Sequence, residues 1–433
     1  MRAKEIVLLV LVIAAGILLY QERTGKIGFG WRPGDFIFLD GEAFTFQETQ
    51  VLEVPAPASL RLLNAHGAVE IQGAETDKIT VTFEKKIRRH RETEAKEVAA
   101  ELHLRVEKNG AALVIGTNRD EFRRRNFETN LRLTVPAATA VEVVNSHGPV
   151  TVRGLMAAVI ANSHGEVTAS AIAGGLKVDN SYEDVTVDGV RSRCEIRSTH
   201  ADVSARNVEG GLKVDQSYGF ARLQKIGQRL DLDGPHTEVV AEDVTGPVDI
   251  QNSYEKVTLR RVGPAKVTGH HSDVEATQVD GGLEVATSYA SVDADSVRGG
   301  LRVSGKSVSV TGEAISPGEI SVSTSYEPVT LSGFSGKATI LVSHGGVTLT
   351  PLALSGPLEV RGSYSPIILH WPAGGPYPIE AQCRSGRIHW RITPEARVEE
   401  KDGTEEVKAF SGFADKPTIR LVTSYDNIDV EEN

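Results

Sequence analysis

Histidine recurs in a fixed local setting in the middle of this chain. The stretch "NSHGPVTV" spans residues 145–152, and "NSHGEVTA" spans residues 162–169. Imidazole titrates near neutral pH and is a common metal ligand, so a repeated histidine raises proton transfer, metal binding and structural stacking as alternatives. Catalysis needs a partner at a fixed position, and the sequence has no G-x-S-x-G or H-E-x-x-H motif and no acid at a constant spacing from the histidines. We therefore predict no catalytic histidine.

Metal binding requires histidines that are close enough to share one ion. Zinc holds each nitrogen ligand at ~2.0–2.1 Å, whereas residues in every second coil of a stacked β-structure lie about 9.6 Å apart. In the repeat, His147 and His164 fall in neighbouring units, and His66 joins them if the residues between loop out. These three histidines are the weak candidates for a metal site, and the sequence predicts no other.

The histidines belong to a longer column in which histidine and tyrosine alternate. Its spacing is 17 or 18 residues through the middle of the chain, and it holds seven of the nine tyrosines and seven of the twelve histidines. Between Tyr289 and Tyr326 one position is missing, and Gly305 fills it best, about two residues early. Besides His66 and His147 at its start and Tyr425 at its end, the column consists of His164, Tyr182, His200, Tyr218, His236, Tyr254, His271, Tyr289, Tyr326, His344 and Tyr364.

A period near this length, sustained over most of the chain, predicts a stacked repeat architecture. Apolar residues stand three, five and eight positions after each column residue, and six and four positions before it. Pairs of apolar residues two positions apart indicate two short strands per unit, each with one buried face. Glycine pairs precede the second strand, for example before Leu212. The sequence therefore predicts an all-β fold, a single-stranded β-solenoid with coils of about 18 residues.

Because histidine and tyrosine alternate, the coil could instead be twice as long, with about 36 residues. The outward positions carry Lys177, Glu195, Lys213 and Asp231 in turn. The shorter coil places opposite charges side by side, whereas the longer coil places like charges together, which destabilises a sheet. Asp249 after Asp231 breaks the alternation, but the pattern as a whole favours the shorter coil.

In such coils the column is a structural ladder, with each aromatic ring stacked on the ring of the next coil. Asparagine stands two positions before several column residues. We expect these side chains to form a hydrogen-bonded ladder at the turn, beside the rings: Asn145, Asn162, Asn180 and Asn252.

The N-terminus carries a targeting signal. Basic residues precede an uninterrupted apolar run, "IVLLVLVIAAGILLY", at residues 6–20. The run is short for a membrane span, but flanking side chains can extend it. The residues after it offer neither a small-x-small cleavage site nor a lipidated cysteine, which favours an uncleaved signal anchor over a cleaved signal peptide or a buried core helix. We predict a single-pass membrane protein whose bulk is extracytoplasmic, in the periplasm or on the cell surface.

The repeat divides the chain into five parts. Residues 1–5 are a cytoplasmic tip, 6–20 the transmembrane anchor and 21–50 a juxtamembrane linker. Residues 51–370 form the solenoid, interrupted at 85–130 by a small α/β insertion that covers its N-terminal end. Residues 371–433 lose the register, regain it at "TSYDNIDV", and form C-terminal coils and a cap.

Repeated "x-S-x-G-x-V-x-V" and "G-G-L-x-V" units behind one N-terminal apolar segment resemble a bacterial β-strand-repeat family of candidate adhesins, a domain of unknown function. The resemblance covers residues 51–433. It implies a β-solenoid exposed in the cell envelope and provides no catalytic residues. The strict alternation of histidine and tyrosine is a departure from the family pattern.

These observations favour a non-catalytic adhesin-like or scaffold protein that binds an envelope glycan or another surface protein. The net charge of −11 argues against a nucleic-acid partner. Two cysteines cannot make a disulfide framework, and Cys194 occupies a position that elsewhere holds Leu or Val. We expect no cofactor. The alternatives are a polysaccharide-active β-helix enzyme, which would need one distinguished cluster of charged residues, and a metal-binding surface protein.

Overall fold

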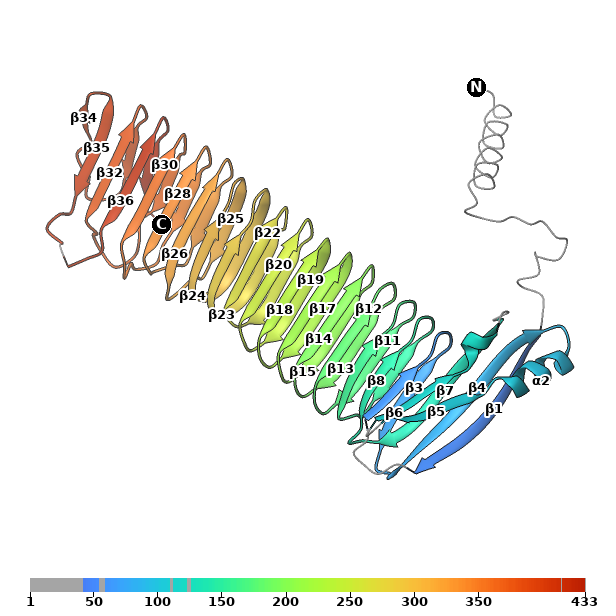
Figure 1. Cartoon of the computed structure of the whole chain (residues 1–433). Coiled ribbons are helices and arrows are strands. Elements are labelled where there is room, and N and C mark those ends of the chain that lie inside the picture. The colour runs from blue at the N-terminus through green and yellow to red at the C-terminus, as the bar shows by residue number, and fades with distance from the viewer. Residues whose placement is uncertain (1–41, 54–58, 110–111, 123–125, 414, 433) are drawn as a thin grey trace, which may run out of the picture.

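The computed structural model describes residues 42–53, 59–109, 112–122, 126–413 and 415–432. They form a rod of 37 β-strands with a single α-helix near its N-terminal end, α2 (Glu92–Glu101), and a short 3-10 turn, η1 (Arg119–Glu121) (Figure 1). None of the helices in this part of the chain is long and apolar enough to span a bilayer. The predicted anchor at residues 6–20 lies outside the described residues.

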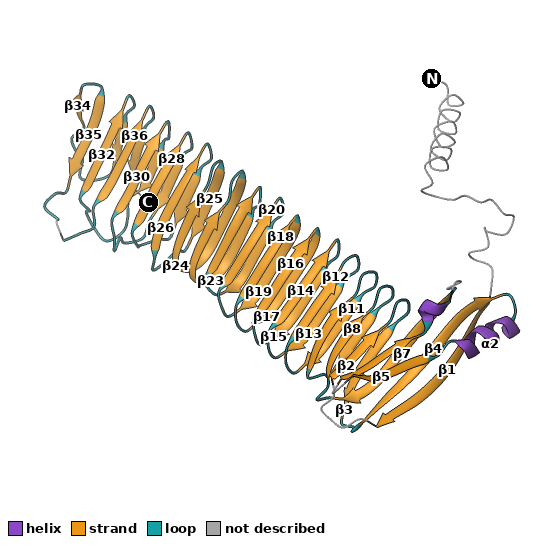
Figure 2. Ribbon diagram, in the orientation of Figure 1, coloured by secondary structure: helices purple, strands orange, loops and turns teal. Residues whose placement is uncertain are grey.

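Each coil contributes one strand to each of two parallel rows (Figure 2). Row A ends at the column of histidines and tyrosines, and row B follows it. Row A contains β2 (Ser59–Leu63), β8 (Ala140–Val144), β10 (Ala157–Ala161), β12 (Leu176–Asn180), β14 (Cys194–Thr199), β16 (Leu212–Ser217), β18 (Leu230–Pro235), β20 (Val248–Ser253), β22 (Ala265–His270), the second halves of β23 (Val274–Ala286) and β24 (Ala290–Ser304), β26 (Glu319–Ser325), β28 (Ala338–Ser343) and β30 (Leu358–Ser363). Row B contains β3 (Val69–Ala74), β9 (Val150–Arg153), β11 (Val167–Ile172), β13 (Val185–Val190), β15 (Val203–Val208), β17 (Gly219–Ile226), β19 (Thr237–Val244), β21 (Val257–Val262), the first halves of β23 and β24, β25 (Val308–Glu313), β27 (Val329–Ser332), β29 (Val347–Thr350) and β31 (Ile367–His370).

The register of row A fixes the length of one coil. Leu176 pairs with Cys194, Cys194 with Leu212, and Leu212 with Leu230, all in parallel strands. The prediction of a single-stranded β-solenoid with coils of about 18 residues is confirmed. The coil of twice that length is excluded.

The same register brings opposite charges together on the outer face. Lys177 pairs with Glu195, and Glu195 with Lys213. Asp231 does pair with Asp249, the like-charge pair that breaks the pattern. The Arg229 guanidinium bridges the two carboxylates, with Nε 2.6 Å from Asp231 and Nη2 3.2 Å from Asp249. A neighbouring cation therefore compensates this unfavourable pair.

The core lies between the two rows and is almost entirely aliphatic. In row B the inward residues are Val185, Val187 and Val190, all fully buried. Strict alternation would turn the residue at position 190 outward, but Gly189 has φ +78° and kinks the strand. In the next coil Asn207 takes the same left-handed conformation, with φ +56°. The kink recurs in every coil from Gly154 to Gly333. It explains why apolar residues fall three, five and eight positions after the column rather than at even intervals.

The N-terminal end of the rod is threaded out of sequence order. The coil formed by β2 and β3 lies between the coil of β8 and β9 and a coil formed by β6 (Ala112–Thr117) and β7 (Phe127–Pro136). The insertion therefore supplies a coil of its own. Beyond it, β5 (Leu104–Asn109) pairs antiparallel with β6, β4 (Lys78–Arg89) with β7, and β1 (Glu42–Glu53) with β4. Strand β1 begins within the range predicted as a linker.

The C-terminal end uses the same device. The last strands of the chain, β36 (Ile419–Ser424) and β37 (Ile428–Glu431), lie between the coil of β30 and β31 and the coil of β32 (Ile379–Arg384) and β33 (Ile388–Arg391). Strands β34 (Glu399–Lys401) and β35 (Thr404–Ala409) form a hairpin that pairs antiparallel with β32. An antiparallel cap at each end covers strand edges that would otherwise pair with another chain.

Candidate functional site: a column of stacked rings

The histidines and tyrosines of the repeat lie in one continuous column along the corner between rows A and B. Each lies one to three residues after the end of a row A strand, so the strand register places successive rings over one another. The tyrosines of the column are 49–57 % exposed although they belong to an ordered turn. The column is therefore a surface feature, with one edge of every ring facing solvent.

Neighbouring rings stack face to face. Ring centroids are 4.6–6.0 Å apart from His147 to Tyr289 and again from Tyr326 to Tyr425, and planes differ by 2–20°. The threading at the C-terminal end brings Tyr425 onto Tyr364, at 4.7 Å, although several strands separate the two tyrosines along the chain. The column thus gains a ring from a distant segment.

The backbone at the column is unusual for such bulky residues. From His200 onward the column residues have positive φ, for example +60° at Tyr218 and +76° at Tyr254. The left-handed conformation costs an L-residue roughly 1–2 kcal/mol, and glycine adopts it almost freely. A tyrosine at such a position has a backbone cost that a glycine would not have, and its stacked side chain must compensate for it.

The column begins with three histidines in successive coils. His66 and His147 are 5.5 Å apart and tilted by 41°, and His147 and His164 are 4.7 Å apart and nearly parallel. Partial burial, the positive charge of Arg119 and the neighbouring His147 hold the pKa of His66 below its ordinary value, against the opposing effect of Glu128. Stacked rings present their faces and not their nitrogen lone pairs to one another. In the part of the chain that the structure describes, no group of three or more His, Cys, Asp or Glu side chains is placed to hold a metal ion.

The asparagines beside the column are buried and do not bond to one another, which corrects the predicted side-chain ladder. The Asn162 Nδ2 group donates to the carbonyl oxygens of Gly148 (3.2 Å) and Gly165 (2.8 Å), which lie in two neighbouring coils. Asn145 makes the corresponding bonds to Gly67 and Gly148. Asn180 likewise donates to carbonyl oxygens of two neighbouring coils, whereas Asn252 donates within its own turn, to Glu255. The first three amides therefore tie successive turns together through their backbones, which fixes the turn that presents the ring.

One coil lacks a ring, and the residue in its place is Ser307 rather than Gly305. Ala290 pairs with Val308, which sets Tyr289 beside Ser307, and Ser307 has the same left-handed conformation as the rings, with φ +53°. Its place therefore keeps the regular spacing after Tyr289, and Tyr326 follows one residue late. The prediction of Gly305 was wrong because a serine has no aromatic ring that would mark its position in the sequence.

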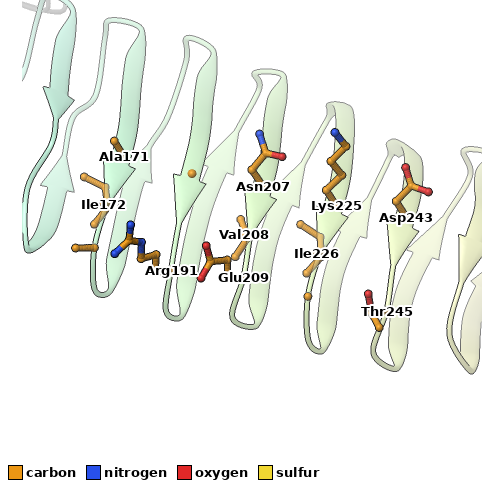
Figure 3. Close-up of a pocket in the computed structure, with 13 residues that line it drawn as sticks. Ala171, Ile172, Arg191, Asn207, Val208, Glu209, Lys225, Ile226, Asp243 and Thr245 are labelled. Carbon is orange, nitrogen blue, oxygen red and sulfur yellow. The ribbon is translucent and has the colours of Figure 1, made fainter.

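The kinked position near the end of the row B strands carries a second column that sequence reasoning missed. Asn207, Lys225 and Asp243 occur at the same position of three successive coils and line a groove of about 750 Å³ (Figure 3). All three have positive φ. Their regular spacing was visible in the sequence, but their side chains share no chemical type. The groove is open and mixed in charge.

Comparison with known proteins identifies a family for this chain. The family model of Toastrack DUF4097 matches residues 59–340. A crystal structure of a candidate cell adhesion protein from Clostridium sporogenes is similar over 90 % of this chain and 100 % of its own, with 8 % sequence identity and a TM-score of 0.16, values that carry no argument about function. A search of curated proteins found no significant match. Since the family model covers well over half of the sequence, the chain belongs to the Toastrack DUF4097 family, whose function is unknown.

Proposed function

We propose that this protein is a membrane-anchored, extracytoplasmic β-solenoid that acts as a non-catalytic, adhesin-like interaction or scaffold protein of the cell envelope. The observation that carries the proposal is the exposed column of rings. Tyrosine is enriched where proteins bind partners, because it buries a large area with few rotatable bonds and keeps a polar tip. A rod that repeats this side chain at every second coil presents many equivalent contacts along one edge.

Anchoring and location rest on the sequence of the N-terminus. Basic residues before the apolar run at 6–20 orient the chain with its bulk outside the cytoplasm. A rod held at one end by such an anchor extends away from the membrane. The partners that fit this arrangement are an envelope glycan or another surface protein, both of which bind exposed aromatic faces.

The charged groups on the outer face of row A favour a structural role over an enzymatic one. The Arg197 guanidinium lies 2.8 Å from Glu195, 3.3 Å from Asp215 and 3.7 Å from Asp179. A glycosidase needs two carboxyl groups that are free to act as acid and as base or nucleophile. Carboxylates that share an arginine across three coils instead hold neighbouring strands together.

The experiment is retention of the full-length protein on isolated cell envelopes that have been stripped of lipid, in detergent, so that the N-terminal anchor does not contribute. Tyr218 and Tyr254 are replaced by Asn, which tolerates the left-handed conformation, and we expect at least a fivefold loss of retention. The matched control replaces Lys225 and Gln278 by Asn at the kinked positions of the row B strands, where φ is also left-handed, +56° and +58°. Equal retention by both variants, or no retention of the parent protein, would overturn the proposal.

A further inference from the structure

The column of rings is interrupted at one coil, and a tyrosine ring borders the gap on each side. Tyr289 and Tyr326 are 54 % and 57 % exposed, and each stacks on a histidine only on its far side, at 5.3 Å for His271 and 5.1 Å for His344. Among the described residues no ring lies between these two tyrosines, since Ser307 occupies the intervening position. Two aromatic faces are thus turned toward each other across a serine.

The width of this gap is set by the sheet. Neighbouring parallel strands are about 4.8 Å apart, so two steps separate the tyrosines by about 9.6 Å. Carbon atoms in contact are ~3.5 Å apart, so the two tyrosine rings together occupy about 3.5 Å of this distance. About 6 Å of free space remains between them. The gap accepts one ring, as the rest of the column does. A pyranose chair carries hydrogens on both faces and therefore fills this space more completely than a flat aromatic ring does.

The edges of the gap are polar. Ser288 comes directly before Tyr289 in the sequence, and Lys306 directly before Ser307. The Ser288 hydroxyl accepts a hydrogen bond from the Lys306 backbone N–H at 3.4 Å. Lys306 is exposed and forms no salt bridge with any residue that the structure describes. Hydroxyl and ammonium groups beside aromatic faces match a sugar, whose faces are apolar and whose rim carries hydroxyls.

A groove of about 600 Å³ leads to the same place. It runs along the ends of the row A strands and reaches Ser288 and Gly305, directly beside the gap. Its other lining residues are mostly small or carry hydroxyl or amide groups, among them Asn252, Ser253 and Thr268. A chain of sugars that places one ring in the gap therefore has room for its neighbours in this groove.

We propose that Tyr289, Ser307 and Tyr326 form a binding slot for one pyranose ring of a glycan. The two faces of the sugar stack on the tyrosines, and its hydroxyls meet Ser307 and Lys306 at the rim. This proposal rests on the proposed function, because it assigns a class of ligand to the same column of rings. Its position at the one missing ring makes it a single site on an otherwise repetitive surface.

The test fills the slot. Ser307→Tyr supplies the missing ring at a φ of +53°, which Tyr364 already adopts with +54°, so the variant should fold. Binding of chitotetraose and cellotetraose to the full-length protein is followed by saturation-transfer NMR and tyrosine fluorescence. We expect at least one of the two to bind, and Ser307→Tyr to weaken that binding at least tenfold. Ser307→Ala, which keeps the slot open, should weaken it less than threefold.

The control for an added tyrosine is Thr330→Tyr, an exposed position on β27 away from the column, which should bind as the parent does. Failure of both oligosaccharides to bind, stronger binding of adenosine as a flat probe, or unchanged binding by Ser307→Tyr would overturn the slot. Retention on envelopes separates this result from the proposed function. If the parent is retained on envelopes but binds neither oligosaccharide, the slot is refuted and the adhesin-like role stands.

Discussion

Tyr218 and His236 stack with their ring centroids 4.9 Å apart and their planes only 2° from parallel. The two residues lie one repeat apart in the sequence, and the parallel register of β16 and β18 places them in neighbouring coils. A neutral imidazole against a phenol gives a polar–aromatic contact at every pH at which the imidazole is uncharged. Alternation therefore limits how many imidazoles lie next to one another.

The alternation predicts a pH effect. Replacing Tyr182 and Tyr218 by His leaves an unbroken run of histidines from His66 to His236. Protonated rings in such a run repel one another, so protonation costs more in the folded chain than in the unfolded chain. The variant should match the parent near pH 8 and lose stability more steeply as the pH falls below ~6.5. Urea unfolding at pH 8 and pH 5 measures the difference.

The matched control for this variant replaces the same two tyrosines by Asn, which removes the stacking without adding titratable groups. Its loss of stability should not depend on pH. A double histidine variant that is no more acid-sensitive than the parent would refute the electrostatic reason for alternation.

His66 should make the parent protein itself acid-sensitive. Its folded-state pKa is lowered by burial and by nearby positive groups, so the unfolded chain takes up the proton first. The stability that it contributes is present above the unfolded value of about 6.5 and is lost as the pH falls through the folded value. His66→Asn should therefore flatten the fall in unfolding free energy between pH 7.5 and pH 5. The exposed His90→Asn should leave that fall unchanged.

Leu212 tests the core. It is 1 % exposed and pairs with Cys194 and Leu230 in the two neighbouring coils, as the repeat predicted. Leu212→Ala should destabilise the surrounding coils by about 2–5 kcal/mol, because it leaves a cavity in a close-packed interior. The adjacent outward Lys213→Ala should change stability by no more than about 0.5 kcal/mol. Hydrogen exchange would show whether only nearby coils loosen, as expected for a repeat protein.

The two cysteines should be chemically inert in the folded protein. Burial raises the pKa of the Cys194 thiol to about 12, and burial with the nearby Glu405 carboxylate raises that of Cys383 to about 11. The thiolate is the reactive form, so neither side chain should be labelled by iodoacetamide at pH 8. Both should react once urea unfolds the chain. Rapid labelling of the native protein would show that these coils open readily.

The N-terminal segment predicts how the protein fractionates. If residues 6–20 are an uncleaved anchor, the mature chain begins at its own N-terminus and stays with membranes after carbonate extraction. The control replaces Leu9 and Val12 by Lys, which should release the protein from the membrane because charge in the apolar run is costly. A mature N-terminus near residues 20–30 would instead identify a cleaved signal peptide.

The repeat itself could be read from the sequence because each coil makes the same local demands. Inward apolar pairs such as Leu212 and Val214 recur once in every coil, since each coil must bury one face of each strand. The charge sequence from Lys177 to Asp231 was enough to choose the shorter coil over the longer one, because like charges in register are unfavourable. The ring column followed from the same register.

What the tertiary structure alone decided lies where the chain leaves that register. At each end of the rod, the outermost coil is not the first or last in sequence: β6 and β7 lie beyond β2 and β3, and β32 and β33 lie beyond β36 and β37. No local preference encodes which coil stacks on which. The position of Ser307 was misplaced because a serine carries no aromatic signal, and only strand pairing located it. The local sequence pattern determines the shape of one coil, because that shape depends on short-range sterics and on which side chains are buried. The order in which coils stack depends on contacts between residues far apart in the chain, and these appear only when the whole rod is assembled.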